Sequence, residues 1–207
     1  DTRKPAVLPF VPDLLREPAF RVSTVLLDHR IPCLGLSIRE KFHVNIKKDA
    51  LAEMDLDTGP WIQAFKQALY EKRSPDTRIE ISCKDTVRQY SLGTLENQIA
   101  VITPGQKITY ITDMIYSPDN IDKVIDFAKG SDQLYIEAAF LEADAHMAAK
   151  KYHLTAKQAG EIAGRAGVKK MFPLHFSPRY SDHAHLLEAE AQTAFKETKA
   201  MIKSLEN

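Results

Sequence analysis

The fold class of this chain can be inferred from residues 132–180, which read DQLYIEAAFLEADAHMAAKKYHLTAKQAGEIAGRAGVKKMFPLHFSPRY. It begins and ends with short apolar runs, LYIEAAF and KKMFPLHF, which are typical of buried strands. Between the runs, apolar residues recur on one face of a predicted helix, at Ala156, Ala159, Ile162, Ala163 and Ala166. Because a strand–helix–strand unit joins parallel strands, the stretch predicts a layered α/β fold.

Further strands and helices are predicted outside this unit. Aromatic and β-branched residues predict strands over 20–27, 33–40, 78–82, 97–104 and 107–113. Apolar periodicity predicts helices over 61–69, 118–128 and 183–206, and Gly130 is suited to end the second of them. The order of elements predicts a mixed sheet with flanking helices, in a single domain over 1–207.

Composition limits the partners and the compartment. The formal net charge of 0 means that a nucleic-acid substrate could be held only by local basic patches. Cys33 and Cys83 cannot form a disulfide framework and lack metal-ligand spacing, so a cytoplasmic location is expected. No apolar run reaches the roughly 18 residues of a membrane span, and we therefore expect no membrane association.

Potential metal ligands recur at the ends of predicted strands. His29 follows one strand, Asp113 ends another, Glu137 lies inside LYIEAAF, and His175 follows FPL. A single histidine at a strand end is more often structural, but four such positions point to a common edge where ligands collect. Imidazole and carboxylate groups suit zinc or similar divalent metals, which activate water for hydrolysis.

His153 occupies a different position, just before Leu154 and Thr155. Thr155 is suited to cap the following helix, which would place the imidazole on a loop at the helix entrance. There it could protonate a leaving group; the alternative is a surface histidine. Four other histidines are expected to be non-catalytic: His43, His146, His183 and His185.

Four segments together resemble the metallo-β-lactamase-fold hydrolases, most closely the ribonuclease Z branch of tRNA 3′ endonucleases. These segments are LLDHRIPCLGLSIREK, YITDM, IEAAFLEADAHMAAKKYHLTAKQAGEIAGRAGV and PLHFSPRY, in the order of the family's C-terminal half. The resemblance implies an αββα layered fold. It also implies that His29, Asp113 and His175 are metal ligands and that His153 is a catalytic histidine oriented by Glu137.

The family's His-x-His-x-Asp-His motif does not occur in these 207 residues. Two interpretations of this absence are open, a fragment of a longer enzyme or a degenerate homologue, and the presence of His29, Asp113, His153 and His175 favours the fragment. The fragment would hold an incomplete part of a binuclear zinc site and would be inactive alone. Its sheet would expose an apolar face that a second copy could cover, so a homodimer is expected.

The predicted function is metal-dependent phosphodiester hydrolysis on RNA, with precursor tRNA as the substrate of the full-length protein. Two alternatives stay open. One is hydrolysis of another ester, such as a cyclic phosphodiester or a thioester, and the other is a non-enzymatic degenerate half that acts in dimerisation. DTGPWIQAFKQAL resembles the region of the family that bears an RNA-gripping arm. Nearby basic residues could contact RNA or form a solvated face: Lys41, Lys47, Lys48, Lys66, Lys72 and Arg73.

Overall fold

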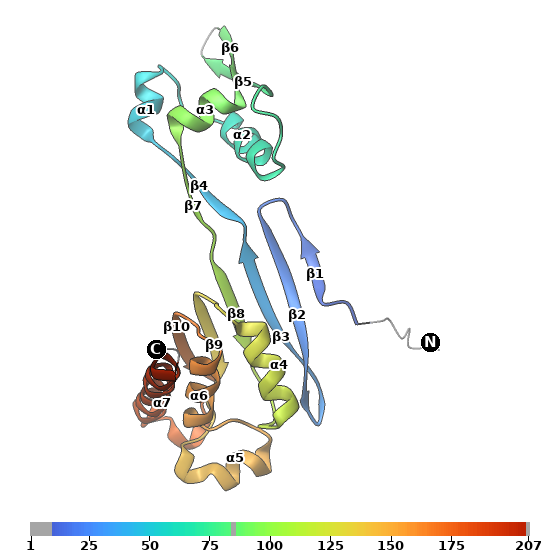
Figure 1. Ribbon diagram of the computed structural model, residues 1–207, viewed down its shortest axis with the longest axis vertical. Helices are drawn as coiled ribbons and strands as arrows, with labels where there is room; N and C mark the ends of the chain where they lie inside the picture. Colours follow the sequence, from blue (N-terminus) through green and yellow to red (C-terminus); the bar gives the residue numbers. More distant parts are fainter. Residues whose placement is uncertain (1–9, 84–85, 206–207) are drawn as a thin grey trace, which may run out of the picture. The chain divides into compact units, whose positions relative to one another are not determined.

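The computed structural model describes residues 10–83 and 86–205, which group into two compact units (Figure 1). The first, here called the sheet unit, comprises the described residues up to Leu15 with Arg21–Ile38 and those from Lys107 onward. The second, here called the inserted unit, comprises Arg16–Phe20 and Arg39–Gln106. The single domain over 1–207 stays a prediction, because grouping by contacts does not establish independent folding.

A six-stranded sheet organises the sheet unit, in the order β1-β2-β3-β8-β9-β10. The strands are β1 (Asp13–Arg16), β2 (Phe20–His29), β3 (Ile31–Glu40), β8 (Lys107–Ile111), β9 (Gln133–Glu137) and β10 (Lys170–Leu174). β9 pairs in parallel with both β8 and β10, which confirms the predicted strand–helix–strand pairing. Arg30 alone joins the neighbouring strands β2 and β3, a connection that only an antiparallel hairpin allows. The sheet is therefore mixed, as predicted.

Helices cover one face of this sheet. They are α4 (Pro118–Ala128), α5 (Ala145–Lys151), α6 (Ala156–Arg165) and α7 (Ala184–Leu205), with short 3₁₀ turns at Glu142–Asp144 and Pro178–Tyr180. α6 packs on β9 and β10, and α4 and α7 pack on α6. The predicted helix face is confirmed, since Ala156, Ala159, Ile162, Ala163 and Ala166 are all buried in the core that α6 shares with the sheet.

Two glycines bring α6 and α7 close together. A Cβ atom added at Gly160 would clash with Ala191 O, and one at Gly164 would meet Thr198 Cβ at 2.6 Å. The spacing of four residues places both glycines on the same side of α6. The sequence AGEIAG therefore sets how closely α7 can lie.

The opposite face of the sheet is apolar and exposed. Strand alternation places Leu34, Leu36 and Ile38 on this face of β3, and Ile108 and Tyr110 on this face of β8. In the sheet register Tyr110 lies opposite Tyr135, which lies opposite Phe172, and the last two rings stack with centroids 4.8 Å apart. A row of three aromatic rings thus crosses the parallel strands.

The inserted unit has its own elements and core. Its elements are β4 (Phe42–Ile46), α1 (Lys48–Glu53), α2 (Trp61–Tyr70), β5 (Arg78–Cys83), β6 (Thr86–Ser91), α3 (Leu92–Ile99) and β7 (Ala100–Pro104). β4 pairs antiparallel with β7, and β5 pairs antiparallel with β6. Trp61 is 8% exposed and donates through Nε1 to Asp57 O at 3.0 Å. The tryptophan is therefore a packing residue of this core.

The strand predicted over 97–104 is wrong at its start. Residues up to Ile99 belong to α3, and the strand begins at Ala100. The Ser91 side chain caps α3 by accepting from Thr94 N, and the helix buries Leu92, Leu95 and Ile99. These three positions lie on one face of a helix, and the Ser91 cap fixes where that helix begins. Together these features favour a helix although Ile99 is β-branched.

Candidate active site

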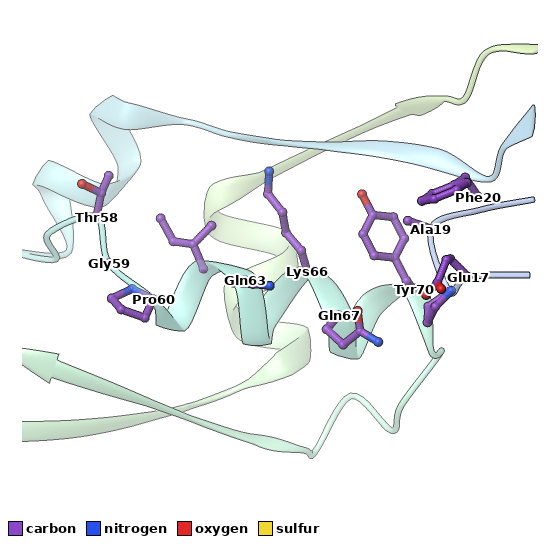
Figure 2. Close-up of a pocket in the computed structure, with 12 residues that line it drawn as sticks. Glu17, Ala19, Phe20, Thr58, Gly59, Pro60, Gln63, Lys66, Gln67 and Tyr70 are labelled. Carbon is purple, nitrogen blue, oxygen red and sulfur yellow. The ribbon is translucent and has the colours of Figure 1, made fainter. Parts of the chain in front are cut away.

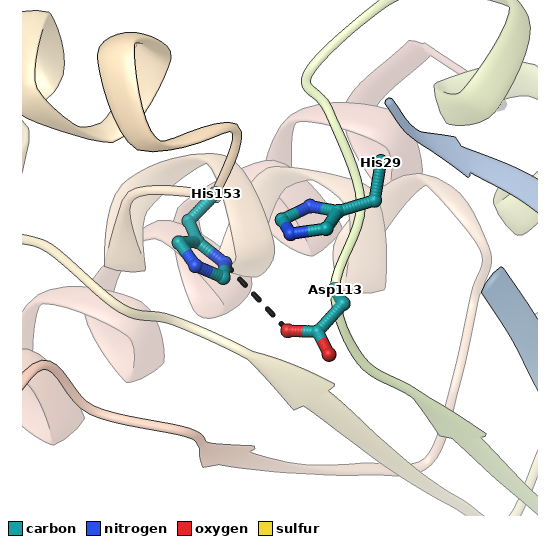
Figure 3. Close-up of side chains that lie close together, drawn as sticks. All are labelled: His29, Asp113 and His153. Atoms are coloured by element: carbon teal, nitrogen blue, oxygen red, sulfur yellow. Dashed lines mark ion pairs between the residues drawn. The ribbon is translucent and has the colours of Figure 1, made fainter. Parts of the chain in front are cut away.

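The five residues singled out from the sequence come together at one edge of the sheet. His29 and Glu137 are the last residues of β2 and β9, Asp113 lies just beyond β8, and His175 directly follows β10. His153 reaches the same place from the loop between α5 and α6, beside His29 and Asp113 (Figure 3). The recurrence of polar residues at strand ends therefore did predict a shared location.

Short distances join the five side chains. His175 Nδ1 lies 3.0 Å from Asp113 Oδ1, and His153 Nδ1 lies 3.8 Å from the same oxygen. The ring centroids of His153 and His29 are 4.9 Å apart. Two groups of three side chains have potential ligand atoms within 4.8 Å of one another. The first is His29, Asp113 and His153, and the second is Glu137, His153 and His175.

Glu137 is buried, and its carboxylate is bound on several sides. Its Oε1 accepts from Met114 N at 2.6 Å, and its Oε2 accepts from Leu154 N at 3.4 Å and lies 2.8 Å from His153 Nδ1. Because both oxygens already have partners, Glu137 is better placed to orient His153 than to coordinate a metal. This geometry fits the role expected for Glu137, which is to orient His153 and not to bind the metal.

The bond to Glu137 determines the protonation of His153. A hydrogen bond from the imidazole to this carboxylate raises the pKa of His153 above its ordinary value, against a smaller opposing effect of burial. Asp113 adds a weaker attraction in the same direction. Since Nδ1 is bound to the carboxylate, the proton available for chemistry is the one on Nε2.

His29 is held in one tautomer by a backbone group. Its Nδ1 lies 2.8 Å from the carbonyl oxygen of Tyr152, which can only accept, so Nδ1 carries the proton. In the neutral ring this tautomer leaves the lone pair on Nε2, the form in which histidine binds metals. Arg30 stacks over the Tyr152 ring at 4.7 Å and supports this segment.

Backbone strain concentrates at this edge of the sheet. Six non-glycine residues of the described chain have a left-handed φ, and four of them are site residues or their neighbours: Arg30, Asp113, Tyr152 and His175. Such a conformation costs roughly 1–2 kcal/mol for a residue with a Cβ, and strain of this kind clusters at functional sites. The distribution is independent support for a site here.

The donor set fits a borderline divalent metal. Imidazole nitrogens and one carboxylate are the ligands that zinc prefers, and Asp113 is within reach of two imidazoles. The side chains are 36% exposed for Asp113 and 43% for His175, against 20% for His153 and 0% for Glu137. Asp113 and His175 are thus more exposed than His153 and Glu137. The assignment of roles stays a prediction.

Two pockets differ in their relation to these residues. One of about 370 Å³ opens beside His153 and His175 and is lined also by Phe140, Lys151 and Phe176, which the sequence reasoning did not single out. A larger one of about 620 Å³ lies in the inserted unit, between 17–20 and α2 (Figure 2). None of the five site residues lines the larger pocket.

Comparison with known proteins shows what this chain is similar to. Residues 84–176 match the beta-lactamase superfamily domain, a range that contains Asp113, Glu137, His153 and His175. The metallo-beta-lactamase fold protein YhfI from Bacillus subtilis covers 91% of this chain with 16% sequence identity and a TM-score of 0.48, and 49% of that protein is matched.

Two curated relatives carry a more particular name. The chain is 32% identical over 184 residues to a ribonuclease Z of Deinococcus radiodurans, covering 88% of this chain and 52% of the relative. It is 34% identical over 180 residues to a ribonuclease Z of Thermobifida fusca, covering 86% of this chain and 50% of the relative. The chain thus spans about half the length of the curated relatives it matches. The resemblance to part of a metallo-β-lactamase-fold hydrolase, most like ribonuclease Z, is confirmed, as is the α/β class.

The first prediction concerns the buried carboxylate. Glu137→Ala leaves the N–H groups of Met114 and Leu154 buried without their acceptor, and each unpaired donor costs about 1–3 kcal/mol. We expect a fall of at least this size in the free energy of unfolding measured in urea without metal. The control is Glu80→Ala, at an exposed position of β5 that bonds only Gln89 among the described side chains. Equal losses in the two variants would show that the buried bonds of Glu137 contribute little.

Proposed function

We propose that the full-length protein carrying this chain is a cytoplasmic, metal-dependent phosphodiesterase that cleaves RNA, with the 3′ end of precursor tRNA as its target. The observation that supports this most directly is His153, bound by buried Glu137 and facing Asp113, His29 and His175. The similarity to proteins named ribonuclease Z supports the substrate. No described helix is long and apolar enough to cross a bilayer.

We propose zinc as the metal, with His29, Asp113 and His175 as ligands. Bound zinc would supply an activated water and would stabilise negative charge on the phosphate. Three ligands are too few to close two metal positions, so the 207 residues would hold an incomplete part of a binuclear site. This chain alone is then expected to be inactive.

His153 would act at the leaving oxygen. When water attacks phosphorus and the ester bond breaks, the departing oxygen must gain a proton, and His153 Nε2–H is placed to donate it. The Glu137 carboxylate keeps Nδ1 protonated and stabilises the imidazolium before the transfer. Glu137 itself stays ionised and acts by orienting the ring.

Two histidine substitutions separate metal binding from proton transfer. In the full-length protein, His175→Ala should remove zinc and abolish cleavage of precursor tRNA. His153→Ala should keep the zinc content and lower kcat by roughly 10²–10⁴-fold, the usual contribution of a positioned acid. Metal analysis of the purified protein and single-turnover cleavage measure the two effects. Unaffected cleavage by His175→Ala, or loss of zinc from His153→Ala, would overturn the assignment.

Basic residues of the inserted unit are proposed to contact RNA. All six candidates from the sequence, Lys41, Lys47, Lys48, Lys66, Lys72 and Arg73, belong to this unit. Arg73 is paired with Glu71 at 2.6 Å, which weakens its case, whereas Lys47 and Lys48 are exposed at the start of α1. These two lysines are the better candidates for phosphate contacts.

Charge reversal tests this RNA contact. Lys47→Glu with Lys48→Glu should weaken binding of precursor tRNA and flatten its dependence on salt, because fewer counterions are released. The matched control is Lys157→Glu with Lys196→Glu, which makes the same change of charge at exposed positions of α6 and α7. Binding measured from low to high salt distinguishes the pairs. An unchanged slope in the first pair would mean that these lysines only form a solvated face.

A homodimer is also proposed, supported by the exposed apolar face of β3, β8 and β10. Covering it with a second copy would remove Leu36, Tyr110 and Phe172 from water. Sedimentation over a range of concentrations should show a dimer that Tyr110→Lys shifts to monomer. A wild-type monomer at every concentration would contradict the proposal.

A further inference from the structure

Asn120 is a fully buried amide near the start of α4 that lies outside the site already described. Its Nδ2 donates to Asp28 O at 2.8 Å and to Ile115 O at 2.9 Å, and its Oδ1 accepts from Asp28 N at 3.0 Å. Ile115 N also donates to Asp28 O at 2.9 Å. One side chain therefore binds two backbone segments that are far apart in the sequence.

The two segments carry two of the proposed ligands. Asp28 directly precedes His29, and Ile115 lies two residues beyond Asp113. In the sheet, β3 separates β2 from β8, so ladder hydrogen bonds cannot join the end of β2 to the loop after β8. The connection is made instead by the direct backbone bond from Ile115 N to Asp28 O and by Asn120 from the adjacent helix layer.

The chemistry of the contact requires an amide. Asn120 meets two carbonyl oxygens, each of which also accepts one backbone N–H, and the N–H of Asp28, which donates to its oxygen. Asparagine carries an NH₂ group and an oxygen at the end of a short side chain, whereas aspartate and leucine of similar size lack the donors. A residue that served only to fill space would not need this pattern.

The bonds of Asn120 complement the one that Tyr152 makes. Tyr152 O fixes the rotation and tautomer of the His29 ring. Asn120 binds the backbone N–H and carbonyl of Asp28, the residue before His29. The first interaction sets where Nε2 points, and the second sets where the His29 backbone lies relative to Asp113. Removal of either would loosen the distance between the two ligands.

We propose that Asn120 is a positioning residue that fixes the separation of His29 and Asp113 and thereby raises the affinity of the site for a divalent cation. This role rests on the proposed metal site. Substitution of residues that orient metal ligands without binding the metal typically changes metal affinity 10–100-fold. The same magnitude is expected here.

The test measures Zn²⁺ binding to the full-length protein by competition with a chromophoric chelator. Asn120→Ala should raise the dissociation constant about 10–100-fold, and Asn120→Ser, which supplies one hydroxyl in place of the amide, should raise it less. Thr109→Val is the control, since Thr109 is equally buried in β8 but bonds Ser37 and Ser131, away from the site. It should lower thermal stability and leave the dissociation constant unchanged.

A second readout needs no metal. In the metal-free protein the ¹⁵N shifts of the neutral His29 ring should report a single Nδ1–H tautomer. Asn120→Ala releases the backbone of Asp28, which should displace the His29 ring from Tyr152 O and convert that tautomer to a mixture. Unchanged zinc affinity and unchanged shifts in that variant would overturn the proposal, as would an equal effect of Thr109→Val. If both Asn120 variants unfold at the assay temperature, the residue serves the whole fold and the proposal fails.

The two measurements also separate this inference from the proposed function. A wild-type protein that binds no Zn²⁺ overturns the metal site, and with it the effect on affinity. An intact zinc site that tolerates Asn120→Ala overturns only the positioning role.

Discussion

The hydrogen-bonded carboxylate of Glu137 is the interaction on which the candidate site depends. A buried carboxylate is costly unless its oxygens are satisfied, and here the donors come from Met114, Leu154 and His153. The end of β9, the loop after β8 and the loop before α6 must therefore arrive together. The same contact that stabilises these three segments also orients the imidazole, so packing and chemistry are not separable at this point.

Much of this arrangement follows from local sequence patterns. The strand–helix–strand unit and its parallel pairing are visible as apolar runs around a helical repeat, and His29, Asp113, Glu137 and His175 mark strand ends. Because the sheet is parallel over β8, β9 and β10, the ends marked by Asp113, Glu137 and His175 meet at one edge. The capping box of Thr155 and Gln158 likewise follows from residues three positions apart.

Other features could not be predicted because their partners are distant in the sequence or carry no side-chain signal. Asn120 reaches Asp28 across 92 positions, and His29 is held by a backbone carbonyl 123 positions away. A carbonyl leaves no trace in residue identity, so the role of Tyr152 is invisible to pattern reading. The strand β1 was missed for a different reason, since its proline-rich surroundings show no period-two alternation.

Because the backbone at Asp113 and His175 is left-handed, some substitutions there could impair the candidate site without lowering the stability of the fold. Glycine adopts that conformation without strain, so a change to glycine at either position would remove a proposed ligand while costing the fold little. Such a protein would reach normal abundance in the cell and pass the chaperones and proteases that remove unstable variants. Surveys that score variants by protein level would rate these two positions as tolerant, although they lie at the centre of the candidate site.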